Sequence, residues 1–486
     1  MERNSLQGFE LENHMREIAP RSQRRTTVAP TYFFDVSDIL SYVRTESSIS
    51  GIQRVSLELI KRISAQPGAA NVMISFWTLD DRYVALPASY ITDMPEFDTD
   101  RLSHMFFGTR ARRMEQTAPT LARYRLRPLK YWVYSIVRHF KAAIGDEAHF
   151  VNKGCSIAEW KSYHAREHEV TPFPPQPKGQ LVGDLVKPGD RVVVLGAVFG
   201  LSKLAKELER LKNDKQIDVT IFVHDLIPIL AKEHLNGGFS HKFDNWLRNS
   251  TNYCSSYLAN SCHTSRDLLS YLEKEGAPRP VKVVPLAQQF HRPDAAEEGA
   301  FSEQVRQILD HPFVLVVGTL EDRKNLLRLA LAWQYLCVDE NIATPKLIFA
   351  GKQNWQSPDF PDFMRQTKSL NGMVEIVNRP SDVELAALYS NCLFTAMVSL
   401  YEGWGLPIGE SLSMGKTAVV ARSTSMPEVG GDLVEYCDPL DVESIATACK
   451  TLIVDTAHRK ALEGRIAQTR LRTWDDVAEE FIQALR

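Results

Sequence analysis

The sequence lacks the patterns that mark zinc-binding, secreted and membrane-spanning proteins. Its seven cysteines include no Cys-x-x-Cys pair and no Cys/His cluster with zinc-like spacing. Residues 1–25 are polar and charged, so no secretory leader is expected. No run of about 18 apolar residues predicts a spanning helix. We therefore expect free thiols in a reducing cytoplasm, and a protein that is soluble or lies on the inner face of the plasma membrane.

An excess of charge of one sign is also missing. The chain has 57 basic and 60 acidic residues and a formal net charge of −3. A nearly neutral chain argues against wholesale nucleic-acid binding, which usually needs a strongly basic domain. Hydrophobic residues make up 44% of 486 positions, so most of the chain should fold, as two or three domains.

Short apolar runs that alternate with helical patterns predict an α/β fold. Strands are expected in the first half at residues 31–36, 72–77, 191–196, 219–225, 252–254 and 281–285. A second set is expected at residues 313–318, 346–351, 374–377, 393–396 and 417–421. Near-continuous apolar strands are typical of buried parallel sheets. Two consecutive sets predict two Rossmann-like domains that face a cleft, with ligands outside the carboxyl ends of the strands.

The alternation of predicted strands and helices also indicates the domain boundaries. Residues 1–29 have mixed charge and little periodicity, which favours a disordered tail. An N-terminal domain is predicted over residues 30–300, with an insertion at about 86–180 where the α/β pattern stops. A C-terminal domain is predicted over residues 301–470, followed by a helix over residues 471–486.

The segment Ser399–Glu410 is the most informative for chemistry. Glu402 and Glu410 lie eight positions apart, separated by a Gly-x-Gly sequence and a proline, before a predicted helix at residues 411–415. Glycines let a backbone approach a ligand and expose amides that bind phosphate at a helix start. Glu410, expected in the first helical turn, and Glu402 could accept hydrogen bonds from sugar hydroxyls. A plain turn with a favourable first-turn charge is the alternative interpretation.

This segment resembles the Glu-x₇-Glu signature of the retaining glycosyltransferases of family four, which have the GT-B fold. The resemblance extends from about Gly318 to Pro439, and its motif forms are closest to bacterial polysaccharide mannosyltransferases. It includes residues 318–325, similar to the donor-phosphate loop of the family, and residues 423–432 with Asp438-Pro439. Several spaced motifs in the right order are more specific than a single glycine-rich loop.

The resemblance implies roles for individual residues. The donor would be bound by Thr319, Arg323, Lys324, Glu402, Gly403, Trp404, Gly405, Leu406 and Glu410. Lys324 and Arg323 would stabilise the negative charge that develops on the leaving diphosphate. Glu410 would hold the ribose and Glu402 the donor sugar. Many relatives have an arginine where this chain has Thr319, so one phosphate contact is expected from elsewhere, with Arg323 the candidate.

Two segments of the N-terminal half also resemble the family. His224 and Asp225 end a predicted strand, in a His-Asp-Leu sequence like that of polysaccharide mannosyltransferases. The resemblance makes them catalytic candidates together with Glu402, with His224 near the reacting carbon. Gly51, Ile52 and Arg54 resemble the glycine loop that faces the cleft, and residues 474–485 resemble the helix that crosses back to the N-terminal domain.

The resemblance implies front-face displacement, so no protein nucleophile is expected, and no metal or cofactor is needed for this interpretation. The nucleotide sugar is a substrate. Asp98 and Asp100 form an Asp-x-Asp sequence that binds metal in the other glycosyltransferase fold. They lie in the predicted insertion and follow no clear strand, so we do not assign them a function.

A basic, aromatic segment suggests a membrane partner. Between Arg110 and Lys141 there are nine basic residues and one acid, Glu115. Tyr124, Tyr131, Trp132, Tyr134 and Phe140 are interleaved with them. This composition is typical of helices that bind anionic lipid headgroups. Aromatic packing against the N-terminal domain, with the charges in solvent, is the equal alternative.

The sequence therefore predicts a hexosyltransferase that extends a surface polysaccharide or a lipid-linked glycan. GDP-mannose is the preferred donor, while dTDP-rhamnose, UDP-glucose and UDP-N-acetylglucosamine stay open. A hydrolysing nucleotide-sugar 2-epimerase and an inert binding protein with the same fold are the alternatives.

Overall fold

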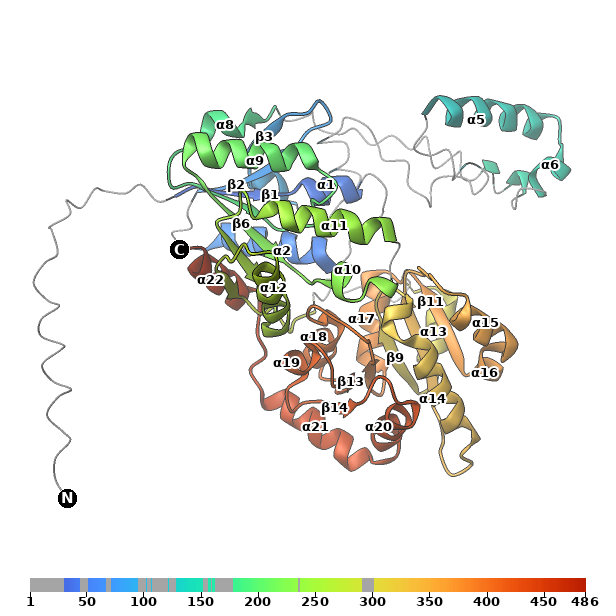
Figure 1. Cartoon of the computed structure of the whole chain (residues 1–486). Coiled ribbons are helices and arrows are strands. Elements are labelled where there is room, and N and C mark those ends of the chain that lie inside the picture. The colour runs from blue at the N-terminus through green and yellow to red at the C-terminus, as the bar shows by residue number, and fades with distance from the viewer. Residues whose placement is uncertain are drawn as a thin grey trace, which may run out of the picture.

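The computed structural model describes residues 30–43, 51–66, 71–94, 128–151, 178–234, 237–290 and 301–486, with single residues and short pieces between 102 and 161. Two α/β domains account for most of them (Figure 1). The predicted tail and the Asp98-x-Asp100 sequence lie outside the described residues. Among the helices that the structure describes, none combines the length and the apolar content that a bilayer crossing requires.

The N-terminal domain is built on an eight-stranded sheet with the order β4-β3-β2-β1-β5-β6-β7-β8. Its strands are β1 (Tyr32–Asp35), β2 (Val72–Trp77), β3 (Tyr83–Pro87), β4 (Gln180–Leu181), β5 (Arg191–Val194), β6 (Asp218–Val223), β7 (Ser256–Ala259) and β8 (Val281–Val283). All pairs are parallel except those that β3 makes with β2 and β4. The strand order reverses between β1 and β5, which is where such sheets bind ligands.

The helices of this domain form because apolar side chains recur at helical spacing. In α2 (Gly51–Ala65), Val55, Leu59, Ile60 and Ile63 are all buried. The others are α1 (Ser37–Val43), α3 (Ser89–Thr92), α8 (Val182–Leu185), α9 (Ser202–Lys215), α10 (Ile227–Leu230), η2 (Lys232–His234), α11 (Gly237–Ser250) and α12 (Cys262–Lys274).

The C-terminal domain has a six-stranded parallel sheet with the order β11-β10-β9-β12-β13-β14. The strands are β9 (Phe313–Val317), β10 (Lys346–Gly351), β11 (Val374–Asn378), β12 (Thr395–Met397), β13 (Ala418–Ala421) and β14 (Glu435–Cys437). Successive residues of β9 pack into different buried clusters, Val314 and Val316 into one, Phe313 and Leu315 into the other. Both faces of this sheet are therefore covered, which explains its continuous apolar strands.

The covering helices follow the strands in sequence. They are α13 (Glu303–Leu309), η4 (Asp322–Lys324), α14 (Leu326–Val338), α15 (Asp359–Gln366), α16 (Lys368–Gly372), α17 (Asp382–Asn391), α18 (Leu406–Ser413), α19 (Met426–Gly430), α20 (Val442–Val454) and α21 (Thr456–Gln468). The strand order reverses between β9 and β12, so the carboxyl ends of these two strands are the expected ligand-binding edge.

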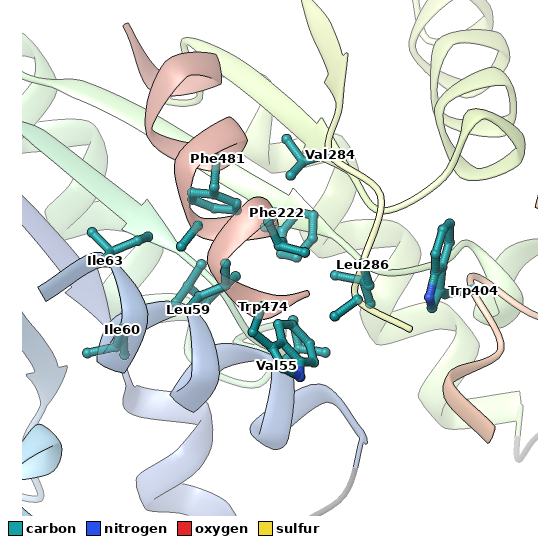
Figure 2. Packing of buried hydrophobic residues seen from close by; sticks show 14 of the residues in the cluster. Val55, Leu59, Ile60, Ile63, Phe222, Val284, Leu286, Trp404, Trp474 and Phe481 are labelled. Atoms are coloured by element: carbon teal, nitrogen blue, oxygen red, sulfur yellow. The ribbon is translucent and has the colours of Figure 1, made fainter. Parts of the chain in front are cut away.

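The last helix, α22 (Trp474–Leu485), returns to the N-terminal domain, as expected for the GT-B fold (Figure 1). Its apolar face packs against α2 and the N-terminal sheet, and Phe481 lies 5.3 Å from Phe222, ring centre to ring centre (Figure 2). Its first turn is fixed by a capping box between Thr473 and Asp476. This packing anchors the chain end that leaves the C-terminal domain.

An arm made of α5 (Pro128–Ala143) and α6 (Glu147–Val151) stands away from both domains (Figure 1). A small separate cluster of Leu121, Tyr131, Phe150 and Trp160 is buried within it. The arm belongs to the region predicted as an insertion. The predicted insertion begins inside β3 and ends at β4, and neither strand was predicted, because β4 has only two exposed residues and the antiparallel β3 does not continue the alternation of strands and helices.

Two further strand predictions differ from the structure. Residues 252 and 253 end a turn, and the strand begins at Ser256; Tyr253 and Cys254 are buried in a core cluster of the domain without belonging to a strand. Strand β14 was not predicted, since its three residues, Glu435–Cys437, are too few and too polar to stand out.

Candidate active site

The carboxyl ends of β9 and β12 meet at a small hollow in the C-terminal domain. Thr319 and Lys324 line it on one side, and Met397, Val398 and Ser399 on the other. Gly318 has a φ of +139°, a conformation that L side chains rarely adopt. The chain thereby turns from β9 into η4 with its backbone close to Gly351, where an added Cβ would lie 1.9 Å from the Gly318 carbonyl oxygen.

Asn325 fixes the end of this loop. It adopts a left-handed conformation with φ 62° directly before α14. Its side-chain amide donates to the carbonyl oxygens of Val398, at 3.0 Å, and Pro439, at 2.7 Å. These bonds tie the loop to the ends of β12 and β14, so the neighbouring cations have defined positions.

Arg323, Lys324 and Glu402 form a compact ion cluster. Glu402 Oε1 lies 2.8 Å from Arg323 Nη1 and 2.6 Å from Lys324 Nζ. Arg323 Nη2 also donates to Glu321 Oε1 at 2.6 Å, and Nη1 to the Tyr401 carbonyl. Arg323 is 8% exposed, so its guanidinium is largely committed to protein partners. Lys324 is therefore the cation that is better placed to bind a ligand.

The two cations keep Glu402 ionised at neutral pH. Burial raises the pKa of Glu402, but Arg323 and Lys324 lower it more strongly, to about 2. Glu402 is thus a carboxylate at neutral pH that can accept hydrogen bonds and does not carry a proton to donate.

The loop between Glu402 and Leu406 is held by hydrogen bonds with Thr424 and Ser425. The Glu402 N–H donates to Thr424 Oγ1 at 3.1 Å. The Ser425 hydroxyl lies 2.9 Å from the Glu402 carbonyl and 3.1 Å from that of Trp404. Gly405, with φ 108°, is the residue before α18. The Trp404 indole is buried beside Leu286 (Figure 2), and in the described part of the chain its N–H has no acceptor.

Glu410 occupies a different place on its helix than predicted. Because α18 begins at Leu406, Glu410 lies in the second turn and not in the first, and the interpretation as a first-turn charge is wrong. Its Oε1 is 3.2 Å from Arg54 Nη1 of the N-terminal domain, and its Oε2 accepts from the Tyr389 hydroxyl at 2.7 Å. Glu410 therefore joins the two domains. Each carboxylate oxygen retains a lone pair for a further donor.

His224 and Asp225 lie directly after β6. His224 Nε2 donates to the Leu195 carbonyl at 2.7 Å, which leaves Nδ1 as an acceptor. Burial lowers the pKa of His224 to about 4, so the ring is neutral at pH 7. Asp225 Oδ1 accepts from the Ile227 N–H at 3.0 Å. Burial raises the pKa of Asp225 to about 6, although Arg323 lowers it.

The structure brings the predicted residues of the two domains together. A Cβ atom on Gly403 would lie 2.0 Å from the His224 carbonyl oxygen, and one on Gly51 would lie 3.4 Å from Leu406 Cδ1. Thr264 Oγ1 bridges this contact with a bond of 3.3 Å to the Gly403 carbonyl. Ile52 is half-buried in the first turn of α2. The candidate site is thus a junction of both domains.

Two polar contacts around the candidate site were not predicted from the sequence. Glu428 accepts from the Cys262 and His263 N–H groups at the start of α12, at 2.7 and 2.8 Å. At the reversal point of the N-terminal sheet, the Gln53 amide donates to Asp38 Oδ2 at 2.7 Å, and burial raises the pKa of Asp38. Gln53 directly precedes Arg54, which was predicted to face the cleft, and this position is the sequence feature that could have indicated a role for Gln53. The described residues contain no group of three or more potential metal ligands.

Two facing parallel-sheet domains with a returning C-terminal helix define the GT-B fold of glycosyltransferases. Anabaena HepE in complex with UDP and glucose shares the fold at a TM-score of 0.51 and 14% identity, over 94% of this chain and 99% of HepE. Sucrose-phosphate synthase from Thermosynechococcus elongatus gives a TM-score of 0.51 at 15% identity, over 94% and 98%.

Residues 299–468 match the family model "Glycosyl transferases group 1". The chain therefore has the GT-B fold, and its C-terminal domain is similar to the group 1 glycosyltransferases, as the sequence predicted. O-antigen chain mannosyltransferase B of Escherichia coli is 30% identical over 184 residues, which are 38% of this chain and 48% of that protein. Serotype-specific mannosyltransferase WbdA of Escherichia coli is 25% identical over 264 residues, 54% of this chain and 32% of WbdA. The matched segments thus span less than half of these relatives.

Proposed function

We propose that the protein transfers a hexose from a nucleotide sugar to a glycan acceptor, with retention of configuration. The single observation that carries the proposal is the cluster of Lys324, Arg323 and Glu402 at the ligand-binding edge of the C-terminal sheet, with His224 across the domain junction. The Lys324 ammonium, with the Arg323 guanidinium beside it, suits a diphosphate, and a fixed carboxylate suits sugar hydroxyls.

The chemistry follows from the charges. Breaking the bond between the sugar and the diphosphate leaves negative charge on the phosphate oxygens, which Lys324 stabilises in place. Glu402 fixes the Lys324 ammonium and is itself held ionised, so the site is organised before the donor binds. The neutral His224 ring offers its Nδ1 as an acceptor for a donor-sugar hydroxyl. Since two side-chain cations supply the positive charge, we propose that the transfer needs no metal ion.

Mannose is the proposed sugar and GDP-mannose the proposed donor. O-antigen chain mannosyltransferase B, WbdA and the MMP α-(1→4)-mannosyltransferase of Mycolicibacterium hassiacum, 29% identical over 119 residues, are all named as mannosyltransferases. The proposed acceptor is a growing surface polysaccharide or lipid-linked glycan, and the proposed location is the cytoplasmic side of the membrane. The chemistry of the ion cluster does not depend on these choices.

A transfer assay tests the proposal. The full chain is incubated with GDP-mannose, UDP-glucose, UDP-N-acetylglucosamine or dTDP-rhamnose, with and without a bacterial lipid-linked glycan extract. We expect labelled sugar to enter the glycan from GDP-mannose, with release of GDP that rises about tenfold or more when the extract is present. Consumption of UDP-N-acetylglucosamine without any acceptor would instead identify a hydrolysing 2-epimerase. Turnover of none of the four donors would leave an inert binding protein.

A further inference from the structure

The exposed side of α5 carries a continuous apolar face. Trp132 is 62% exposed and Phe140 64% exposed, on a helix that stands away from both domains (Figure 1). The exposed apolar residues of α5 and the residue after it are Leu129, Trp132, Val133, Tyr134, Ile136, Val137, Phe140 and Ile144. Most recur at intervals of three and four, so they lie along one side of the helix. Monomeric proteins rarely expose an apolar patch of this kind without a partner.

The opposite side of α5 is already occupied, which fixes the orientation of the face. Tyr131 is buried with Phe150 and Trp160 in the small core of the arm. Arg138 is buried as well, and its Nη1 donates to the Tyr134 carbonyl at 3.0 Å. Of the basic residues in the predicted segment, Arg138 thus lies inside the arm, while residues 110–120 lie outside the described residues. The sequence predicted a contact through basic and aromatic residues together; in the structure, the exposed side of α5 is mainly aliphatic and aromatic.

The positive charge near the apolar face of α5 favours an anionic partner. Helix α5 contains Lys130, Arg138 and Lys141 and no acidic residue. Lys130 is exposed, and Lys141 is paired with Asp146 at 2.8 Å. The segment from Arg110 to Lys141 has nine basic residues and one acid, so two copies of it would bring like charges together, which disfavours self-association. Anionic headgroups complement the cations, and the acyl boundary accepts apolar side chains of any shape.

The length of α5 indicates whether it would cross a bilayer or lie along its surface. Its 16 residues span about 24 Å, less than the roughly 30 Å of a hydrocarbon core. A helix of this length with one apolar side lies in the interface plane. Trp132 and Tyr134 are the residue types that prefer this depth.

We propose that α5 inserts its exposed apolar face into the headgroup boundary of an anionic lipid bilayer and so attaches the protein to a membrane. The attachment is independent of the donor chemistry proposed above. It would hold the cleft at the surface where lipid-linked acceptors are located.

Vesicle flotation of the full chain tests the attachment. We expect flotation with phosphatidylglycerol-containing vesicles, weaker flotation with pure phosphatidylcholine, and weakening at high salt. The double variant W132S/F140S should bind the anionic vesicles about tenfold or more weakly, because two large apolar groups no longer enter the boundary. The matched control Y335S/L440S removes two equally exposed apolar residues from the C-terminal domain and should float like the wild type.

Three results would overturn the proposal. One is no flotation of the wild type, and another is equal flotation of W132S/F140S. The third is concentration-dependent dimerisation of the wild type that W132S/F140S abolishes, which would assign the face to a second copy of the chain. Circular dichroism of both variants checks that the arm is still folded. Loss of flotation with unchanged donor turnover would separate this proposal from the transferase proposal.

Discussion

Replacing Lys324 with alanine is expected to lower kcat/KM for sugar transfer about a hundredfold to a thousandfold. The ammonium lies 2.6 Å from Glu402 and beside the loop that would receive the diphosphate, and no other residue of the cluster is equally free to contact a ligand. Because Arg323 still pairs with Glu402 at 2.8 Å, the carboxylate is not left alone and the fold should survive. Steady-state kinetics with the donor that the transfer assay identifies measure the effect.

The matched control is Lys346→Ala. Lys346 also makes a 2.6 Å ion pair, with Glu375, but at the amino end of β10, remote from the ligand-binding edge. We expect its kcat/KM to stay within about threefold of the wild type, as for ordinary surface ion pairs. Equal losses of kcat/KM in the two variants would show that the effect of Lys324→Ala is structural. Transfer by Lys324→Ala at the wild-type rate would show that Lys324 has no role in the reaction.

Gly403→Ala is expected to lower kcat about a hundredfold while nucleotide affinity changes little. The new methyl group would lie 2.0 Å from the His224 carbonyl oxygen, a backbone atom that has to move. The contact also includes the bond from Thr264 to the Gly403 carbonyl, so the two domains would separate at the point where donor and acceptor meet. A displacement of about 1 Å at a reacting centre can cost this factor. The cations stay in the C-terminal domain, so nucleotide binding should persist.

Gly464→Ala is the matched control for this change. Gly464 lies within α21, where an added Cβ meets nothing within 4 Å. We expect unchanged kinetics and a slightly higher unfolding temperature, since alanine favours a helix by about 1 kcal/mol. If Gly403→Ala keeps its kcat, the junction with His224 is not required for transfer; if its nucleotide affinity falls as much as kcat, the loop itself is disrupted.

Much of the fold could be predicted because buried parallel strands leave a clear pattern. Residues 192–194 and 313–317 are apolar without interruption, since side chains on both faces of a central strand are covered. The predictions of strands fail where a strand is not covered on both faces, or where buried residues do not form a strand. The short edge strands β4 and β14 bury little, and the buried Tyr253 and Cys254 belong to a turn that looks like a strand in sequence.

The sequence could predict which motifs contain residues of the candidate site, but not which residues from different motifs contact each other. Lys324 and Glu402 each occur in a segment that resembles the family, but their pairing joins positions 78 residues apart. The pair of Arg54 with Glu410 joins positions 356 residues apart and depends on how the two domains meet. No local pattern encodes such an approach. Likewise, the bond from Tyr389 to Glu410 could not be predicted, because a tyrosine among apolar residues of a helix is ordinarily a core residue.

Calorimetric titration with GDP, UDP and dTDP tests the central claim, that the C-terminal domain binds the nucleotide of a sugar donor. We expect one nucleotide, GDP, to bind the wild type, and Glu410→Ala to weaken binding about tenfold or more, since the buried carboxylate that we propose as the acceptor for ribose hydroxyls is lost. Arg54→Ala removes the same domain contact and leaves the carboxylate in place, so it should bind more tightly than Glu410→Ala. Exposed Glu479→Ala should bind like the wild type. Binding of none of the three nucleotides at millimolar concentration, or equal binding by wild type and Glu410→Ala, would contradict the account.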